Sequence, residues 1–587
     1  MKFTKICKNA FLLGLAGAMA FAAANCGPKI QPDENAGKTK ILVSLYAGGH
    51  GTAYFEQLVA DFMAKNPEYN EKYWIDYVAE KKHASLVEEE LKENPGYKQM
   101  YIMAQNNIVS LAYQGLLEDV SDVVNSNVNG ESVALKDKMF RYDEWQNIYS
   151  VRGDGLYAMP YADSIGGWIY DHQMFLENNW YTFATDADGA TLTEQGITYN
   201  DEEGKLYFVS STGKTNYKEG DRILTAGKDG KFGTYDDGQP VTEKEFDDMV
   251  KKIALTTKVF ISSGQIGSYA QYIISSLVGQ IGGVEEWETY FTYDSNGKEV
   301  TLLEGNNEVK EVITIENGYK VSSMKSIYQA YEWLEKYFDS REAGKGNYTH
   351  PVTQNESANH YDAQAYYLLG YKNEATNPRS AMLLEGAWWE YEARVTFNAL
   401  GERDADRGYG VRDYRYMLLP DLEGQVNDKS VLTAGESGVM IVPHDTNAER
   451  LEVTKAFLGY MASDEAVKTF TTVTGCPMPY DVEFTEDDMK NLTPFARNMT
   501  ELYYDSENID VVRPNFAQIW SPLEYTSDRP KDGYFIPSIN SIQQPQPYKT
   551  LRTYSLDQIR TGLQAYYNAT DWAKWVQQAR DEGFYLD

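Results

Sequence analysis

Residues 383–394, LLEGAWWEYEAR, place two adjacent tryptophans after a glycine and among three carboxylates. A flat aromatic ring can stack on the C–H face of a sugar, and carboxylates can accept hydrogen bonds from sugar hydroxyl groups. Trp388 and Trp389 cannot both face the same way on an extended segment, so we expect one to face a ligand and the other to pack beneath it. The stretch indicates either a carbohydrate-binding surface or a piece of core.

Catalysis by the same carboxylates is the competing interpretation. Acids such as Glu385 and Glu390 could serve a glycoside hydrolase, which holds its two carboxyl groups about 5–10 Å apart. With 87 Asp and Glu residues in the chain, however, such pairs arise by chance. The sequence has no Walker loop and no H-E-x-x-H or G-x-S-x-G motif, and its six histidines are dispersed. We therefore expect a binding protein rather than an enzyme.

The first residues predict export from the cytoplasm. Three lysines precede an apolar run at 10–24, which is too short to span a bilayer comfortably, and a small-residue cleavage region leads to Cys26. Residues 1–25 are therefore predicted to be an export signal. Residues 26–40 are rich in polar residues, proline and glycine, and we expect them to form a tether.

The three cysteines do not predict an intramolecular disulfide, because Cys7 leaves with the signal and Cys476 is left alone. The surroundings of Cys26 resemble a bacterial lipoprotein signal, in which the cysteine becomes the lipidated first residue of the mature chain. They depart from that pattern at Asn25, where Gly, Ala or Ser is usual, and at Ala23, where Leu is usual. The alternative is ordinary cleavage and full secretion.

Charge and tyrosine content narrow the class of partner. The formal charge of −33 disfavours nucleic acids and anionic membrane surfaces through long-range repulsion. The chain has 46 tyrosines against 22 phenylalanines, and tyrosine joins an apolar face to a hydroxyl group. This composition suits polar ligands with apolar patches, although a general compositional bias would give the same count.

Hydrophobic periodicity predicts an α/β fold with a mainly parallel sheet. A buried strand at 40–46 leads into a glycine-rich turn and an amphipathic helix, and the alternation of strand and helix then repeats. In such sheets ligands bind at loops beyond the strand ends, so residues 46–52 and 105–107 should lie at one edge. The predicted elements of this first part are strands at 73–77 and 99–104 and helices at 83–91 and from 107.

A second α/β region is predicted after a crossing segment at 155–161. Residues 186–238 are polar and rich in glycine and turns, and we expect an insertion of short hairpins. The remaining predicted elements are helices at 243–255, 269–278, 326–338, 450–461 and 556–567, and strands at 414–419 and 437–442.

Six spaced motifs occur in one order along the chain: 41–62, 112–120, 155–171, 241–246, 381–388 and 439–479. Each is weak alone. Together they resemble the extracellular solute-binding proteins of bacterial ABC importers, specifically the sugar-binding branch that includes the maltose-binding protein family. Asp171 replaces the asparagine usual in the third motif.

The resemblance implies a type II periplasmic-binding-protein-like fold of two hinge-linked lobes. Residues 41–159 and 408–470 would form the N-terminal lobe, and 160–407 and 471–587 the C-terminal lobe. A carbohydrate, most simply an oligosaccharide, would be clamped in the cleft between them. Ligand contacts with both lobes would stabilise the closed state that permease subunits recognise.

The resemblance also implies a ligand-binding set, with Trp388 as the stacking platform. Structural roles are the alternatives: core packing for the aromatic residues, a buried histidine for His50, and helix capping for the asparagines. The remaining implied residues are Tyr46, His50, Asn106, Asn107, Tyr161, Asp163, Ser164, Tyr269, Tyr272 and Glu436.

One loop has a composition typical of a calcium site. Residues 229–238 alternate acids with glycines, which would let the oxygens of Asp229, Asp236 and Asp237 converge on a hard cation. The spacing is not that of an EF-hand. The alternative is an acidic hairpin without metal, and no other cofactor is expected.

The sequence as a whole predicts a monomeric two-lobe binding protein for carbohydrate uptake, lipid-anchored on the extracytoplasmic side of the cell membrane. It would be secreted if Cys26 is not lipidated. The alternatives are an extracellular glycan-active hydrolase and a sensor that presents a solute to a membrane receptor.

Overall fold

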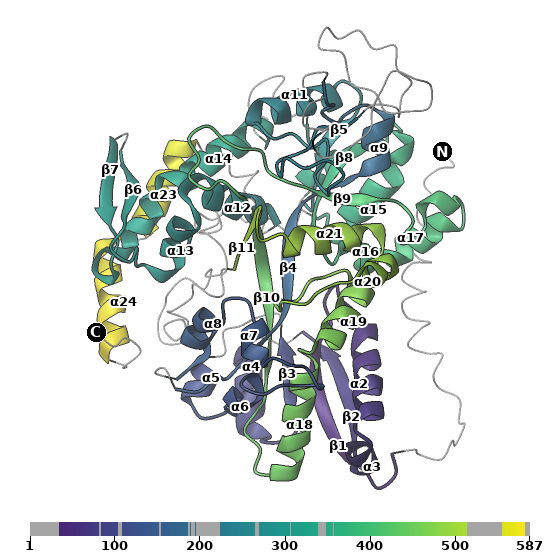
Figure 1. Cartoon of the computed structure of the whole chain (residues 1–587). Helices are drawn as coiled ribbons and strands as arrows, with labels where there is room; N and C mark the ends of the chain where they lie inside the picture. The colour runs from purple at the N-terminus through teal and green to yellow at the C-terminus, as the bar shows by residue number, and fades with distance from the viewer. Residues whose placement is uncertain are drawn as a thin grey trace, which may run out of the picture.

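The computed structural model places most of the chain in two lobes joined by long strands (Figure 1). One sheet runs through both lobes in the order β2-β1-β3-β10-β4-β8-β5, with β11 added beside β10 and β9 beside β4. The structure describes residues 35–81, 84–103, 109–151, 154–185, 188, 194, 223–264, 269–305, 307–338, 348–355, 357–513, 555–566 and 568–581.

The first lobe, at the bottom of Figure 1, is built on β1 (Thr39–Tyr46). β1 pairs in parallel with β2 (Tyr73–Glu80) and β3 (Met100–Met103), as the alternation of strand and helix predicts. Its apolar run is buried, and the apolar face of α2 (Ala53–Lys65) packs on it. The other helices of this lobe are α3 (Pro67–Lys72), α4 (Ala84–Glu93), α5 (Val109–Tyr113), α6 (Ser121–Val124), α7 (Leu135–Lys138), α8 (Tyr142–Tyr149), α18 (Ala448–Tyr460) and α19 (Asp464–Thr474).

The second lobe carries β5 (Lys258–Ile261), β8 (Ser380–Gly386) and β9 (Tyr414–Met417). α11 (Glu243–Ala254) begins at Thr242 with a capping box that Glu245 completes, so this helix starts where its sequence signal predicts. The other helices of this lobe are α9 (His172–Glu177), α12 (Ala270–Gly282), α13 (Val284–Thr292), α14 (Lys325–Phe338), α15 (His360–Leu369), α16 (Trp389–Glu392), α17 (Arg394–Gly401), α20 (Glu486–Asn491) and α21 (Pro494–Tyr504).

Two antiparallel strands, β4 (Met159–Asp171) and β10 (Ser430–Ile441), connect the lobes. At one end β10 pairs with β3 of the first lobe, and at the other end it pairs with β11 (Ile509–Val512). All residues of β4 are buried. The pairing of β4 with β10 is irregular at two places, between Ala434 and Glu436 and between Ser437 and Val439. These long strands form the hinge between the lobes.

The strand pairings change two expectations about the architecture. The sheet is mixed rather than mainly parallel, because β10 pairs antiparallel with β3 and β4, and β4 pairs antiparallel with β8 and β9. The segment 408–429, which the sequence assigned to the first lobe, contains β9, and β9 pairs with the end of β4 beside β8. The chain therefore returns to the first lobe within β10.

Asp171, at the end of β4, has a structural role that explains its place in the third motif. Its carboxylate caps α9 by accepting from Met174 N at 3.0 Å. It also accepts from Arg412 Nε and Nη2 at 2.6 and 2.8 Å, which is the bidentate geometry of a strong ion pair. This pair ties β4 to the segment that leads into β9.

A smaller unit lies at the left of Figure 1, where helices near the C-terminus pack beside a hairpin. The hairpin consists of β6 (Glu299–Glu304) and β7 (Asn307–Val312), and it is followed by a 3₁₀ segment at Ile315–Ser323. α23 (Leu556–Tyr566) and α24 (Ala569–Asp581) pack against that segment, and Trp572 Nε1 donates to Ile315 O at 2.6 Å. Most of the predicted insertion at 186–238 lies outside the described residues, and none of the described helices is long and apolar enough to cross a membrane.

Trp389 belongs to the core, because its ring is fully buried among four aromatic rings. The centroid distances are 6.1 Å to Tyr367, 5.4 Å to Phe397, 5.1 Å to Tyr414 and 6.0 Å to Phe495. The segment is not extended here, since β8 ends at Gly386 and α16 begins at Trp389. The two tryptophans still point into different surroundings.

Trp389→Ala should lower the free energy of unfolding by about 3–5 kcal/mol, because it removes a large buried ring and leaves a cavity. Denaturant unfolding measures this loss. Val395→Ala, at a side chain that is 73% exposed, is the control and should stay within about 0.5 kcal/mol of wild type. A loss below about 1 kcal/mol for Trp389→Ala would contradict its place in the core.

Candidate functional site

Trp388 lies on the second lobe between β8 and α16 and faces the first lobe. Its ring folds back over Gly386, where an added Cβ would lie 2.0 Å from Trp388 Cζ3. Tyr269 and Tyr272 lie beside it, with ring centroids 6.0 and 6.1 Å from that of Trp388. Only 8% of Trp388 is exposed. The three rings form an aromatic surface on the second lobe.

The glycine-rich turn after β1 meets this aromatic surface from the first lobe. A Cβ on Gly49 would lie 2.5 Å from Trp388 Cδ1, and a Cβ on Gly51 would lie 2.7 Å from Tyr391 Cε1. Only a residue without a side chain permits this approach at Gly49. We call the region where the turn at 48–51 meets Trp388 and Tyr391 the interlobe site.

An amide and two carboxylates lie on the second-lobe side of the interlobe site. Gln364, on α15, donates through Nε2 to Glu385 Oε1 at 3.2 Å and to Glu392 Oε2 at 2.8 Å. His360, one helical turn earlier, has Nε2 3.4 Å from Glu392 Oε1. We call Glu385 and Glu392 the acid pair.

The environment moves the pKa values of the acid pair in opposite directions. Burial, and then the negative charge of Glu392, raises the pKa of Glu385 well above its ordinary value. Burial acts on Glu392 in the same direction, but hydrogen bonds from His360, Gln364 and Tyr361 outweigh it and lower its pKa. Of the two acids, Glu385 is thus the one that holds its proton more strongly, and Glu392 is the one that ionises more readily.

His50 brings a polar group to the interlobe site from the first lobe. Its ring is buried 5.6 Å from Phe470 and 6.1 Å from Tyr161, centroid to centroid. Burial lowers its pKa to about 4, against the opposing effect of the negative charge of Glu392. His50 is thus neutral at pH 7, and the charge of Glu392 acts on it across the gap between the lobes.

Several buried polar atoms around the interlobe site have no hydrogen-bond partner. They are both ring nitrogens of His50, Oε2 of Glu385 and the hydroxyl of Tyr391. Both side-chain atoms of Gln271, next to Tyr272 in α12, also have no partner. A buried polar atom without a partner costs about 1–3 kcal/mol, so proteins rarely tolerate several together. Groups of this kind from both lobes are what a hydroxyl-rich ligand would satisfy.

Two predicted site residues on β4 have hydrogen-bond partners within the protein. Tyr161 forms a hydrogen bond with Tyr54 of α2 through their hydroxyl groups. The carboxylate of Asp163 accepts from Tyr503 Oη and Arg513 Nε, both at 2.6 Å, in a fully buried network. We therefore assign Asp163 to the hinge and not to ligand contact.

The other predicted residues divide into those near the interlobe site and those outside the described residues. Tyr46 packs over Gly48 at the end of β1. Ser164 is buried on β4 and pairs with Glu436 of β10, whose side chain is not among those described. Outside the described residues lie Asn106, Asn107 and Cys26.

Sequence reasoning missed Gln364, His360, Tyr391 and Gln271. A signal was present for two of them, since His360 and Gln364 are four residues apart and so share one face of a helix. That face meets the acid pair only because α15 packs against β8, which is a long-range contact.

In the acidic loop at 229–238, carboxylates accept hydrogen bonds from nearby backbone N–H groups. Asp236 Oδ2 accepts from Lys228 N and Asp229 N at 2.6 and 3.1 Å, and Asp237 Oδ2 accepts from Gly233 N at 2.7 Å. Burial raises the pKa of Asp236 and of Asp237 to about 6. No group of three or more His, Cys, Asp or Glu side chains in the described ranges is arranged to hold a metal ion. The calcium interpretation remains a prediction.

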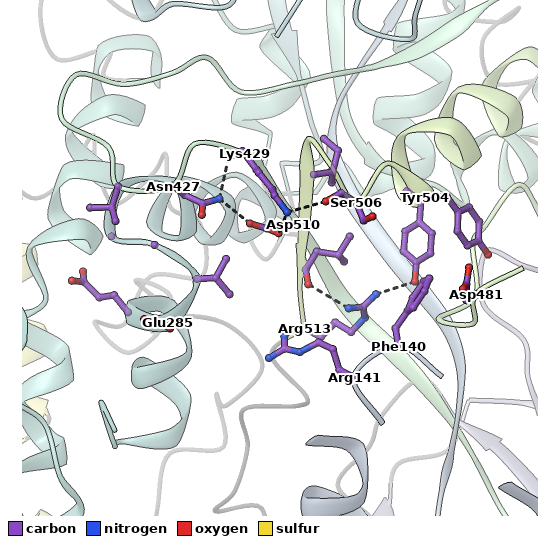
Figure 2. A pocket seen from close by; sticks show the side chains of 18 of the residues that line it. Phe140, Arg141, Glu285, Asn427, Lys429, Asp481, Tyr504, Ser506, Asp510 and Arg513 are labelled. Carbon is purple, nitrogen blue, oxygen red and sulfur yellow. Dashed lines mark hydrogen bonds and ion pairs between the residues drawn. The ribbon is translucent and has the colours of Figure 1, made fainter. Parts of the chain in front are cut away.

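A cavity of about 1180 Å³ lies elsewhere, between α13, α21 and β11, with Phe140 and Arg141 of the first lobe in its wall (Figure 2). Figure 2 shows a small polar network in its wall: Asn427 Nδ2 lies 3.1 Å from Asp510 Oδ2, and Lys429 Nζ lies 2.8 Å from Ser506 O. None of the predicted site residues lines it.

The third carboxylate of the opening stretch, Glu390, faces the second-lobe core. Thr493 Oγ1 donates to its Oε2 at 2.6 Å, while Oε1 has no partner. The residue is only 3% exposed, and burial raises its pKa to about 7. Glu390 is thus structurally distinct from the acid pair.

Solved structures with the same two-lobe fold span nearly all of the chain, although sequence identity is low. One comes from work on xylan utilization by the thermophilic bacterium Caldanaerobius polysaccharolyticus, with 11% identity and a TM-score of 0.52 over 90% of this chain and 100% of that one. Another is a probable secreted solute-binding lipoprotein from Streptomyces coelicolor, with 11% identity and a TM-score of 0.51 over 90% of this chain and 98% of that one. No family model and no curated protein matches the sequence. The likeness shows the fold.

Gly49→Ala should hold the lobes apart, because the added methyl group would overlap the indole of Trp388 while the isolated lobes keep their folds. Small-angle X-ray scattering should show a larger radius of gyration than for wild type. Adding Trp388→Ala to this variant should remove the overlap and restore the wild-type radius. If the scattering of Gly49→Ala matches that of wild type, the two lobes do not meet at this point in solution.

Glu390 predicts a pH dependence of stability. Its folded pKa of about 7 exceeds the ordinary value of 4.5, so its contribution to stability is present below pH 4.5 and is lost as the pH rises to about 7. A shift of this size corresponds to roughly 3 kcal/mol. Glu390→Gln should therefore be more stable than wild type at pH 8 and similar at pH 4.5, in urea unfolding at each pH. If the difference in unfolding free energy between the two proteins is the same at pH 4.5 and at pH 8, the prediction is contradicted.

Proposed function

We propose that this protein captures an oligosaccharide between its two lobes, as the substrate-binding protein of an ABC importer. The observation that carries the proposal is the interlobe site. There an aromatic surface lies beside buried polar atoms from both lobes that have no partner in the protein.

Sugars match both features of the site. Trp388 offers a face for stacking on C–H groups, with Tyr269 and Tyr272 beside it. Glu392 can accept hydrogen bonds from hydroxyl groups, and Glu385, whose pKa is raised by burial, can donate one when it is protonated. An apolar ligand would leave these polar atoms unsatisfied.

The hinge supplies the mechanism of capture. Because β4 and β10 are the long strands that run between the lobes, bending within them opens or closes the interlobe site. A ligand that touches the turn at 48–51 and the aromatic surface together binds only the closed arrangement. Its binding energy then shifts the population toward that arrangement, which permease subunits can recognise.

The known proteins with this fold support the same function. One is described as a secreted solute-binding lipoprotein, and the other comes from work on xylan utilization. We infer an extracytoplasmic location and a lipid anchor at Cys26, on the basis of the N-terminal sequence. The protein would act as a monomer beside membrane-embedded permease subunits.

A glycoside hydrolase is the second candidate, because the pKa values of the acid pair are shifted in opposite directions, as in the acid and the nucleophile of such enzymes. In a hydrolase the scissile bond lies between the two acids. Here the amide of Gln364 is hydrogen-bonded to both. This bridge favours binding over catalysis.

A neutral oligosaccharide of the right linkage should raise the melting temperature, since a ligand at a hundredfold excess over its Kd adds about 2.7 kcal/mol of stability. A thermal-shift screen of mono- and oligosaccharides measures this. Trp388→Ala should weaken binding of the best sugar at least tenfold in calorimetry while the variant stays folded. If affinity survives and stability collapses, Trp388 is core; if only peptides or polyamines shift the melting temperature, the substrate class is wrong.

The hydrolase alternative predicts a product. The sugars that shift the melting temperature should be recovered intact after long incubation with the protein, as judged by chromatography. Cleavage that disappears in both Glu385→Gln and Glu392→Gln would establish the hydrolase instead.

A further inference from the structure

We propose that the interlobe site accepts uncharged oligosaccharides and rejects those that carry carboxylate groups, and that the Glu385–Gln364–Glu392 cluster makes this selection. The inference rests on the proposed function and names its class of substrate. It follows from which charges the site holds and from where they lie.

The cluster places negative charge where a ligand must lie. Glu392 follows Tyr391, whose ring meets Gly51 of the first lobe, and its negative charge also acts on the pKa of His50 in that lobe. Glu385 is buried and has one carboxyl oxygen without a partner. A ligand held between the turn at 48–51 and the aromatic surface would therefore lie beside the acid pair.

No strong cation neutralises this charge within the part of the chain that the structure describes. The ion-pair partner of Glu392 there is His360, and Glu385 has none. His50, the residue opposite, is neutral at pH 7 because burial lowers its pKa. The nearest arginine in sequence, Arg394, is exposed and lies over the ring of Tyr391, with its Cζ 4.2 Å from the ring centroid.

A carboxylate on the ligand would thus be placed beside a buried carboxylate of the protein with little water to screen the repulsion. A sugar hydroxyl at the same position instead donates to Glu392 or to the unpartnered oxygen of Glu385. The cluster offers hydrogen bonds to an uncharged glycan and no counter-ion to an acidic one.

Matched pairs of glycans test the proposal in calorimetry at pH 7. The probes are cellotetraose and maltotetraose with their C6-oxidised counterparts, and xylotetraose with the same backbone carrying glucuronate. Wild type should bind at least one neutral member, and the acidic partner of that sugar should bind at least a hundredfold more weakly. Glu392→Gln, which keeps the shape and removes the charge, should improve binding of the acidic partner at least tenfold.

Glu390→Gln is the control variant, because it removes a buried carboxylate only two residues away that faces Thr493 instead of the gap. It should leave the ratio of the affinities for neutral and acidic sugars unchanged. If Glu392→Gln does not fold, as judged by circular dichroism, Glu385→Gln replaces it. This variant should also reduce the ratio of the affinity for the neutral sugar to the affinity for its acidic partner.

The outcomes distinguish the selection against acidic sugars from the proposed function on which it rests. Equal affinity of wild type for the neutral and acidic members of a pair would overturn the selection while leaving carbohydrate capture intact. Discrimination that persists in the acid-pair variants would overturn the role of the cluster. If no glycan of either kind binds, the proposed function fails and the selection fails with it.

Discussion

The approach of Gly49 to the indole of Trp388 is the constraint on which the rest of the molecule depends. It joins a turn at the end of the first strand to a ring held near the middle of the chain. Everything on either side serves to position those two groups. β1 and α2 fix the turn, while β8, Gly386 and the two tyrosines hold the ring. The hinge strands then decide whether the two groups meet.

The polar atoms around that contact come from both lobes, which distinguishes them from the polar network of the hinge. In the hinge, the carboxylate of Asp163 accepts hydrogen bonds from Arg513 and Tyr503. At the interlobe site His50 of the first lobe and Glu385 of the second keep atoms without partners. A ligand held between the lobes could satisfy groups from both of them at once.

Local patterns carried much of the fold, because they depend on neighbours in the sequence. The apolar run of β1, the capping box of α11 and the hydrophobic spacing of α14 each led to the element that the structure shows. The sequence did not predict which lobe contains residues 408–429, since this depends on which strand β9 pairs with. Hydrophobic periodicity carries no information about which distant strands pair.

The residues of the candidate site also differ in how much the sequence could predict about them. Trp388, Tyr269 and Tyr272 were found through a resemblance and do lie together. The ion pair of Asp163 with Arg513 could not be predicted, because the two residues lie far apart in the sequence.

The course of β10 also bears on how the protein folds. The strand completes the first-lobe sheet beside β3, although it comes after nearly the whole of the second lobe in the sequence. The first lobe cannot finish its own sheet until the chain has passed through its neighbour and returned. Contacts between such distant segments slow folding. For the exported protein that we propose, such a delay would keep the first-lobe sheet unfinished, and the chain open, while it is threaded across a membrane.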